Sequence, residues 1–173
     1  SFRLVETPAF NPTLAPESLI LRFLCANDRR NRDILQQVKA ALKAGRKILI
    51  LSKRVDHLKR LDAMFQREWK EDGEPAIPIG YYIGGMKEEA RDASSRCPLI
   101  LATAQFAAEG LDIPSLDTLF LVTPMVDVEQ AVGRILRSFP DKKDPIVVDV
   151  RDDNIPMFRA YAEKREKLYA RIT

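Results

Sequence analysis

The sequence predicts an α/β fold in which helices cover both faces of a parallel sheet. Two observations support this prediction. Short runs of apolar residues alternate along the chain with longer stretches in which apolar residues recur every three or four positions. The short runs are apolar at every position, which is typical of parallel strands that are buried on both faces. With 173 residues, 46% of them apolar, the chain is large enough for one globular domain with a core.

The N-terminal segment, residues 1–20, contains three prolines and little periodicity. This composition predicts a connector that enters a domain spanning residues 21–173. A first helix is expected from about residue 31, since apolar side chains at Ile34, Leu35 and Val38 have helical spacing. Gly45 is a natural stop for this helix.

Strands and helices then alternate to the end of the chain. The predicted strands are residues 47–52, 78–83, 98–103, 117–123 and 145–150. The predicted helices are residues 54–69, 84–94, 104–110, 128–138 and about 154–171. The last helix either packs back on the sheet or covers part of another domain. In open parallel sheets, ligands bind at the carboxyl ends of the strands, so we sought candidate sites there.

Composition and charge exclude several classes of protein. No apolar run is long enough to cross a bilayer, and no basic segment followed by an apolar one opens the chain. Cys25 and Cys97 lie far apart and there is a single histidine, so neither a zinc site nor a disulfide framework is expected. Two buried thiols indicate a reducing, intracellular location such as cytoplasm or nucleus. The net charge of +3 permits nucleic-acid binding without arguing for it.

The stretch VEQAVGRILRS, residues 128–138, predicts a helix with one polar face. Gln130, Arg134 and Arg137 fall within about 60° of one another at 100° per residue. The opposite side carries the apolar residues Val128, Ala131, Val132, Ile135 and Leu136. Gly133 borders the polar face, where the missing Cβ lets another group approach. Guanidinium groups match phosphate oxygens, although an ordinary solvated helix face is the alternative.

Three further places at strand ends carry polar residues. Thr103 directly follows an apolar strand, and Glu109, Gly110 and Asp112 form a loop that suits a ribose hydroxyl or is a simple turn. Ser52, Lys53 and Arg54 stand where a strand passes into a helix, as phosphate contacts or as a helix cap. Gly84 and Gly85 either free backbone N–H groups at a helix N-terminus or form a plain turn.

Two further observations concern aromatic and titratable residues. Tyr81 and Tyr82 alternate across a strand and are expected to be packing residues. His57 is expected on the surface and not as a catalytic base. We find no set of nucleophile, histidine and acid.

Taken in order, four segments closely resemble motifs IV, IVa, V and VI of superfamily 2 helicases. They are ILILSKRVDHL, GGMKEEAR, ILATAQFAAEGLDIPSLDTLFLVTP and QAVGRILRS. The resemblance covers roughly residues 30–150 and implies the second, RecA-like domain of an ATP-dependent helicase. The ending GRILR, in place of the GRxGR of DEAD-box proteins, is more similar to repair, transcription-coupled and phage or viral DNA helicases. DNA is therefore favoured over RNA.

The resemblance also implies roles for individual residues. Arg134 and Arg137 match arginines that reach the γ-phosphate of ATP, and Gln130 matches a residue beside the nucleotide. Gly110 and Asp112 match positions near the ribose and the cleft between domains. The implied contacts to the nucleic-acid backbone are Thr103, Ser52, Lys53, Gly84 and Gly85. Ala131 stands where many relatives carry a third arginine, so that contact is not expected.

In this family the first domain supplies the phosphate-binding loop and the Asp-Glu pair for Mg²⁺, and this sequence contains neither. The resemblance thus implies that ATP and Mg²⁺ are held mainly by an N-terminal RecA-like domain of the same protein, with residues 1–20 as the link. The chain alone is then expected to be inactive. Two alternatives remain: a non-catalytic RecA-like module that binds nucleic acid or protein, and an unrelated α/β enzyme such as half of a nucleotide-sugar transferase.

Overall fold

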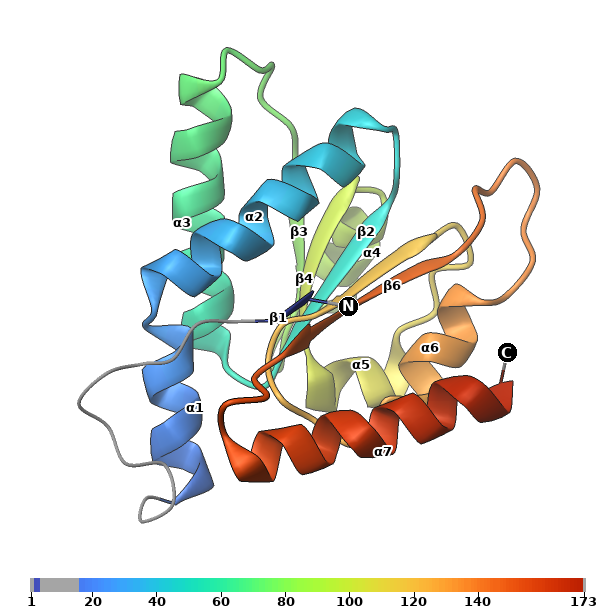
Figure 1. Cartoon of the computed structure of the whole chain (residues 1–173). Helices are drawn as coiled ribbons and strands as arrows, with labels where there is room; N and C mark the ends of the chain where they lie inside the picture. Colours follow the sequence, from blue (N-terminus) through green and yellow to red (C-terminus); the bar gives the residue numbers. More distant parts are fainter. Residues whose placement is uncertain (1, 4–15, 173) are drawn as a thin grey trace.

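The computed structural model describes residues 2–3 and 16–172, and within them it contains one parallel sheet (Figure 1). The strand order is β1-β6-β5-β2-β4-β3, and every neighbouring pair is parallel. The strands are β1 (Phe2–Arg3), β2 (Ile48–Ser52), β3 (Ile79–Tyr82), β4 (Leu99–Thr103), β5 (Thr118–Leu121) and β6 (Ile146–Arg151). The five strands expected from the apolar runs are confirmed.

Helices cover both faces of this sheet. They are α1 (Glu17–Cys25), α2 (Asp28–Lys43), α3 (Val55–Glu71), α4 (Glu88–Ser95), α5 (Ala104–Gly110), α6 (Glu129–Ile135) and α7 (Pro156–Ile172). In Figure 1, α2 and α3 lie on one side of the sheet and α5 and α6 on the other. The predicted α/β fold, with a parallel sheet between helical layers, is therefore confirmed.

The two faces of β2 show why its sequence is apolar at every position. Ile48 and Ile50 pack into a cluster that includes residues of α2 and α3. Leu49 and Leu51 pack into a second cluster that includes residues of α5 and α6. Successive side chains of a strand point to opposite faces, so a strand covered on both sides needs apolar residues throughout.

Helix α1 is the main element that the sequence analysis missed. It begins at Glu17 and places a fully buried Ile20 in a small core with Ile155 and Phe158. Residues 17–20 are thus part of a helix and not of the expected connector. Of the remainder of that segment, Phe2 and Arg3 pair with β6, and residues 1 and 4–15 lie outside the described residues.

Two predicted helices are shorter than expected. α6 ends at Ile135, so Arg137 follows the helix, and Leu136, expected on the apolar side, is 41% exposed. α4 begins at Glu88 instead of residue 84. Gly84 and Gly85 form a turn before it, in which Gly85 has a φ of +82°, a left-handed value that favours glycine.

Helix α7 packs back on the sheet, which decides between the two positions considered for it. Leu168 and Ile172 contact the core cluster shared with α5 and α6, and Arg165 bonds Asp149 of β6. Cys25 and Cys97 are both free and buried, as predicted. Among residues 2–3 and 16–172, no helix has the length and apolarity required to span a membrane.

Candidate functional site

Part of the predicted site lies where the strands end, and the rest lies along α5 and α6. The carboxyl ends of β2 and β4 are in register, with Ser52 opposite Thr103. A hollow of about 160 Å³ opens beside these ends, and its lining includes Ala104 of α5 and Gln130 of α6. Gln130 is exposed there, as its predicted place beside a ligand requires. In Figure 1 this edge of the sheet is the lower one, where α5 and α6 begin.

Arg134 links the two helices that follow β4 and β5. Its Nη1 donates a hydrogen bond of 2.8 Å to the backbone carbonyl of Ala107 in α5, and the residue is half-buried. A Cβ built on neighbouring Gly133 would have no heavy atom within 4 Å. The space beside Arg134 is therefore open to a group from outside the chain.

Arg137 lies beyond the end of α6 and not on the helical face predicted for it. Its Nη1 donates a 2.7 Å hydrogen bond to Oδ1 of Asp112, and the side chains are 50% and 67% exposed. Asp112 follows Gly110, which ends α5. The structure thus brings together two predicted site residues from different motifs. An exposed ion pair contributes only about 0–1 kcal/mol, so the guanidinium can exchange this carboxylate for another anion.

Ser52 differs from the expectation because its side chain is fully buried. Its Oγ lies 3.0 Å from Nδ1 of His57 and accepts a hydrogen bond from the backbone N–H of Arg54. The hydroxyl is thus occupied in holding the turn between β2 and α3. A contact from the Ser52 side chain to a nucleic-acid phosphate does not fit this geometry.

His57 was expected on the surface, and this prediction is wrong. The ring is 1% exposed, and its Nε2 lies 2.9 Å from Oδ1 of Asn31. Because this oxygen can only accept, Nε2 carries the proton and Nδ1 accepts from the hydroxyl of Ser52. Burial, and then the positive charge of Arg30, lower the pKa of His57 to about 3. The histidine is therefore neutral at ordinary pH.

Lys53 is the exposed cation at the end of β2. Its Nζ donates a 3.1 Å hydrogen bond to Glu17 of α1 and lies 5.8 Å from the ring centre of Tyr161 in α7. Its backbone N–H donates to the hydroxyl of Thr123 after β5. Lys53 is thus accessible, and its backbone is fixed by the neighbouring strand.

Thr103 and the Gly84–Gly85 turn follow the neighbouring strands β4 and β3. Thr103 is half-buried, and its hydroxyl makes no hydrogen bond that caps α5. Tyr82 is buried and Tyr81 donates a 2.6 Å hydrogen bond to Asp62, so both are packing residues as predicted. Thr103 and the glycine turn thus place polar groups at the end of β4 and shortly after β3.

Arg91 is a cation at this edge that the sequence analysis did not single out. Its guanidinium lies 5.7 Å from the ring centre of Phe106 in α5. Its Nε is buried without a hydrogen-bond partner among the described residues. Arg91 also lines a hollow of about 420 Å³ together with Tyr82, Glu88, Glu89 and Asp92. It belongs to the quoted segment GGMKEEAR, but only the fold shows that it reaches α5.

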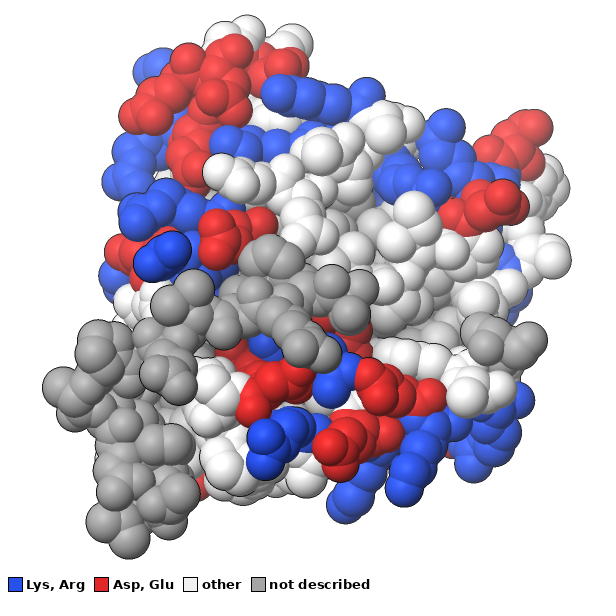
Figure 2. Space-filling view, viewed as in Figure 1, with Lys and Arg blue, Asp and Glu red and all other residues white. Residues whose placement is uncertain are grey.

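The face drawn in Figure 2 does not form one basic field. In the face drawn in Figure 2, lysines and arginines alternate with aspartates and glutamates over α3 and α7. Among residues 2–3 and 16–172, no group of three or more histidine, cysteine, aspartate or glutamate side chains is arranged to hold a metal ion. On this face, an anionic ligand would meet individually placed cations.

Comparison with known proteins identifies residues 30–139 as a helicase conserved C-terminal domain. A protein of Acanthamoeba polyphaga mimivirus, named putative ATP-dependent RNA helicase L396, is 36% identical over 141 residues, which cover 82% of this chain and 26% of that protein. The chain thus spans about a quarter of this relative's length.

Solved structures show the same fold. UvsW of T4 matches with a TM-score of 0.69 at 17% identity, over 92% of this chain and 36% of that one. The helicase MrfA bound to DNA and AMPPNP matches with a TM-score of 0.61 at 17% identity, over 82% of this chain and 20% of that one. Domain 2 of the DEAD-box helicase Mss116p bound to an RNA duplex matches with a TM-score of 0.57 at 18% identity, over 79% of this chain and 56% of that one.

Proposed function

Because the chain belongs to the helicase conserved C-terminal domain family, we propose that it is the second motor domain of an ATP-dependent superfamily 2 helicase or translocase. The observation that carries this proposal is the pair of arginines beside an open edge. Arg134 is anchored to α5 through one nitrogen, and Arg137 is held by an exposed carboxylate. In each guanidinium the remaining N–H groups can donate hydrogen bonds to a phosphate that is bound to another domain.

ATP and Mg²⁺ would be held mainly by the N-terminal RecA-like domain of the same protein. The residues here fit that division in what they offer, because Arg134 and Arg137 present guanidinium donors to a phosphate. Arg134 and Arg137 stabilise the charge that develops on the transferring phosphoryl group, a role that contributes about 10³–10⁵ in rate in related NTPases. The chain alone would not hydrolyse ATP.

Gln130, Gly110 and Asp112 would line the nucleotide side of the cleft between the two domains. Gln130 is exposed in the hollow at the end of β2, and Asp112 is exposed beside Arg137. Asp112 binds Arg137 through Oδ1, which leaves Oδ2 able to accept from a ribose hydroxyl. The same carboxylate can therefore contact the arginine and the sugar.

The nucleic acid would run past the ends of β4 and β3. We assign backbone contacts to Thr103, Lys53 and the Gly84–Gly85 turn, and we add Arg91, a half-buried cation that lines the hollow after β3. Ser52 would act indirectly, by holding the turn that carries Lys53. Contacts of this kind depend on salt and very little on sequence.

DNA is proposed as the substrate on the basis of the GRILR ending. The name of the mimivirus relative points instead to RNA, so the two are compared directly. ATP hydrolysis by the full-length protein is measured with single-stranded DNA, duplex DNA and RNA. We expect stimulation, largest with DNA. Stimulation by RNA alone would overturn the DNA assignment, and no hydrolysis with any of them would favour a non-catalytic module.

A further inference from the structure

The end of α6 is capped by a lysine that is not part of the helix. An α-helix leaves its last carbonyl groups without partners inside the helix, and α6 has only seven residues. Nζ of Lys142 donates hydrogen bonds of 2.6 Å to the carbonyl of Ile135 and 2.5 Å to that of Arg137. A positive charge there also interacts favourably with the helix dipole.

The loop after α6 is folded to bring Lys142 into this position. Asp141 has a φ of 61°, in the left-handed region, and the N–H of Lys142 donates to the carbonyl of Phe139 at 3.2 Å. This tight turn reverses the chain so that the ammonium points back at the helix. Lys142 is half-buried, whereas Lys143 beside it is exposed.

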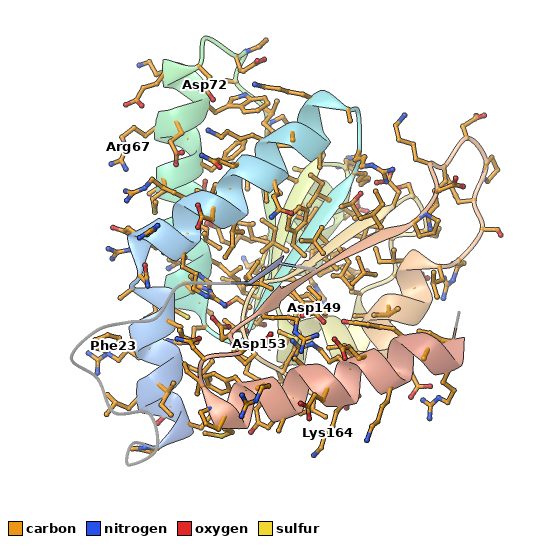
Figure 3. The ribbon with its side chains drawn as sticks, in the orientation of Figure 1. Phe23, Arg67, Asp72, Asp149, Asp153 and Lys164 are labelled. Atoms are coloured by element: carbon orange, nitrogen blue, oxygen red, sulfur yellow. The ribbon has the colours of Figure 1, made fainter. Side chains whose placement is uncertain are left out.

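The opposite end of α6 is held from α7. Nη1 of Arg165 donates 2.7 Å to the carbonyl of Met125, in the segment that leads into α6. The guanidinium is fixed by two further hydrogen bonds to Asp149 of β6 and is 2% exposed. Figure 3 shows Asp149 on the side of β6 near α7, while Lys164, the neighbour of Arg165, projects away.

We propose that Lys142 is a positioning residue for Arg137, an inference that rests on the proposed role of Arg137 at a phosphate. A helix as short as α6 has little stability of its own, so it depends on core packing of Val132 and Ile135 and on the groups that hold its ends. Its start is fixed by Arg165, and Lys142 fixes its end by binding the backbone of Arg137 itself. Lys142 and Arg165 both lie outside the family-matched residues 30–139.

Lys142 affects where the side chain of Arg137 lies when it meets a phosphate. The Asp112 contact is exposed and weak, so the side chain of Arg137 can leave it when a phosphate arrives. The hydrogen bond from Lys142 to the backbone carbonyl of Arg137 holds the backbone of Arg137 in place while its side chain moves from Asp112 to the phosphate. Misplacing a catalytic group by about 1 Å can cost as much as 10²-fold in rate.

The test compares Lys142→Met with Lys143→Met in the full-length protein. Both remove one positive charge from the same loop, but Lys143 makes no hydrogen bond or ion pair among the described residues. We expect Lys142→Met to lower kcat for ATP about tenfold relative to Lys143→Met, with KM for ATP and the thermal midpoint unchanged. Lys142→Arg, which still donates to two carbonyls, should restore kcat.

Equal kcat values for the two methionine variants would overturn the proposal. So would a loss of kcat that comes with a lower thermal midpoint and is not restored by arginine, because that result describes a purely structural role. Hydrogen exchange of the peptide covering residues 129–139 is measured in the same proteins and should be faster in Lys142→Met. Exchange equal to that of Lys143→Met would also overturn it.

Arg137→Ala, assayed in parallel, separates this inference from the proposed function. If that variant keeps its kcat, the arginine role is wrong. The exchange measurement then still decides whether Lys142 fixes the end of α6. If Arg137→Ala loses activity but Lys142→Met does not, the function stands and the positioning role is wrong.

Discussion

Two groups of polar residues use similar side chains in opposite ways. One, which we call the buried network, consists of Arg30, Asn31, Ser52, His57 and Asp152. Each of its members is at most 2% exposed. The other, which we call the open cluster, consists of Asp112, Gln130, Arg134 and Arg137. Its members are half-buried or exposed. Both contain an arginine bonded to an aspartate.

The buried network consists of two sets of bonded polar groups, although Nη1 of Arg30 has no partner among the described residues. Arg30 donates two hydrogen bonds to Asp152, at 3.0 and 2.9 Å, and the histidine bridges Ser52 and Asn31. In the open cluster Arg137 makes one contact, with an exposed carboxylate. The difference teaches that burial commits a guanidinium to the fold, whereas exposure leaves it able to change partners.

The largest expected effect is on catalysis in the open cluster. Arg137→Ala in the full-length protein should lower kcat for ATP by about 10³-fold or more, because it removes the charge that faces the transferring phosphoryl group. The free energy of unfolding should change by less than about 0.5 kcal/mol, since the side chain is half exposed. Steady-state hydrolysis and denaturant unfolding check both. A fall in stability with unchanged kcat would show that Arg137 holds the fold and does not serve catalysis, which contradicts the role given to the open cluster.

The buried network should respond in the opposite sense. Arg30→Met leaves Asp152 buried and unpaired, which costs about 3–5 kcal/mol of unfolding free energy. Arg29→Met is the matched control, because Arg29 is the exposed neighbour in the same helix. Urea unfolding of both variants is the measurement. Equal stability of the two would show that the Arg30–Asp152 pair does not hold the fold.

The buried histidine makes a prediction about pH. Its pKa is lowered to about 3 in the folded chain, against 6.5 in the unfolded chain, so the unfolded state binds the extra proton first. Stability should therefore be unaffected by this residue above pH 6.5. It should fall by about 1.4 kcal/mol per pH unit as the pH drops below that value. Unfolding of His57→Gln between pH 7 and 5 should show a shallower dependence, and equal slopes would contradict the burial.

The smallest effect is expected at the end of β4. Thr103→Ala should leave basal ATP hydrolysis unchanged and weaken its stimulation by nucleic acid about tenfold, because one hydrogen bond to a charged phosphate contributes about 1.5 kcal/mol or more. Titration of hydrolysis with single-stranded DNA provides the measurement. Equal losses of basal and stimulated rates would argue that Thr103 does not contact the nucleic acid.

Much of the fold could be predicted because its signals are local. An apolar run such as ILIL specifies a strand covered on both sides whatever surrounds it. Helix α1 was missed because three prolines dominate the segment before Glu17, although Ile20, Leu21 and Leu24 have helical spacing. These residues become core only through contact with α7, more than a hundred residues away.

The sequence could predict which residues belong to the candidate site but not how they are arranged in space. Arg134 and Arg137 were chosen from residue type and order, and the structure separates them because α6 ends at Ile135. The pairing of Arg137 with Asp112 depends on where two short helices stop. Likewise, His57 shares helical spacing with buried Leu61 and Met64. A polar side chain on such a face is buried only when partners like Asn31 arrive from another helix.

The most direct measurement compares ATP binding and hydrolysis by the 173-residue chain with those of the full-length protein. Thermal unfolding of the chain is measured alongside, and a cooperative transition is required as the control that it is folded. If the open cluster serves a nucleotide that another domain holds, the chain alone should neither hydrolyse ATP nor bind it at concentrations that saturate the full-length protein. Hydrolysis by the chain alone, lost on changing Arg137 to Ala, would contradict this account.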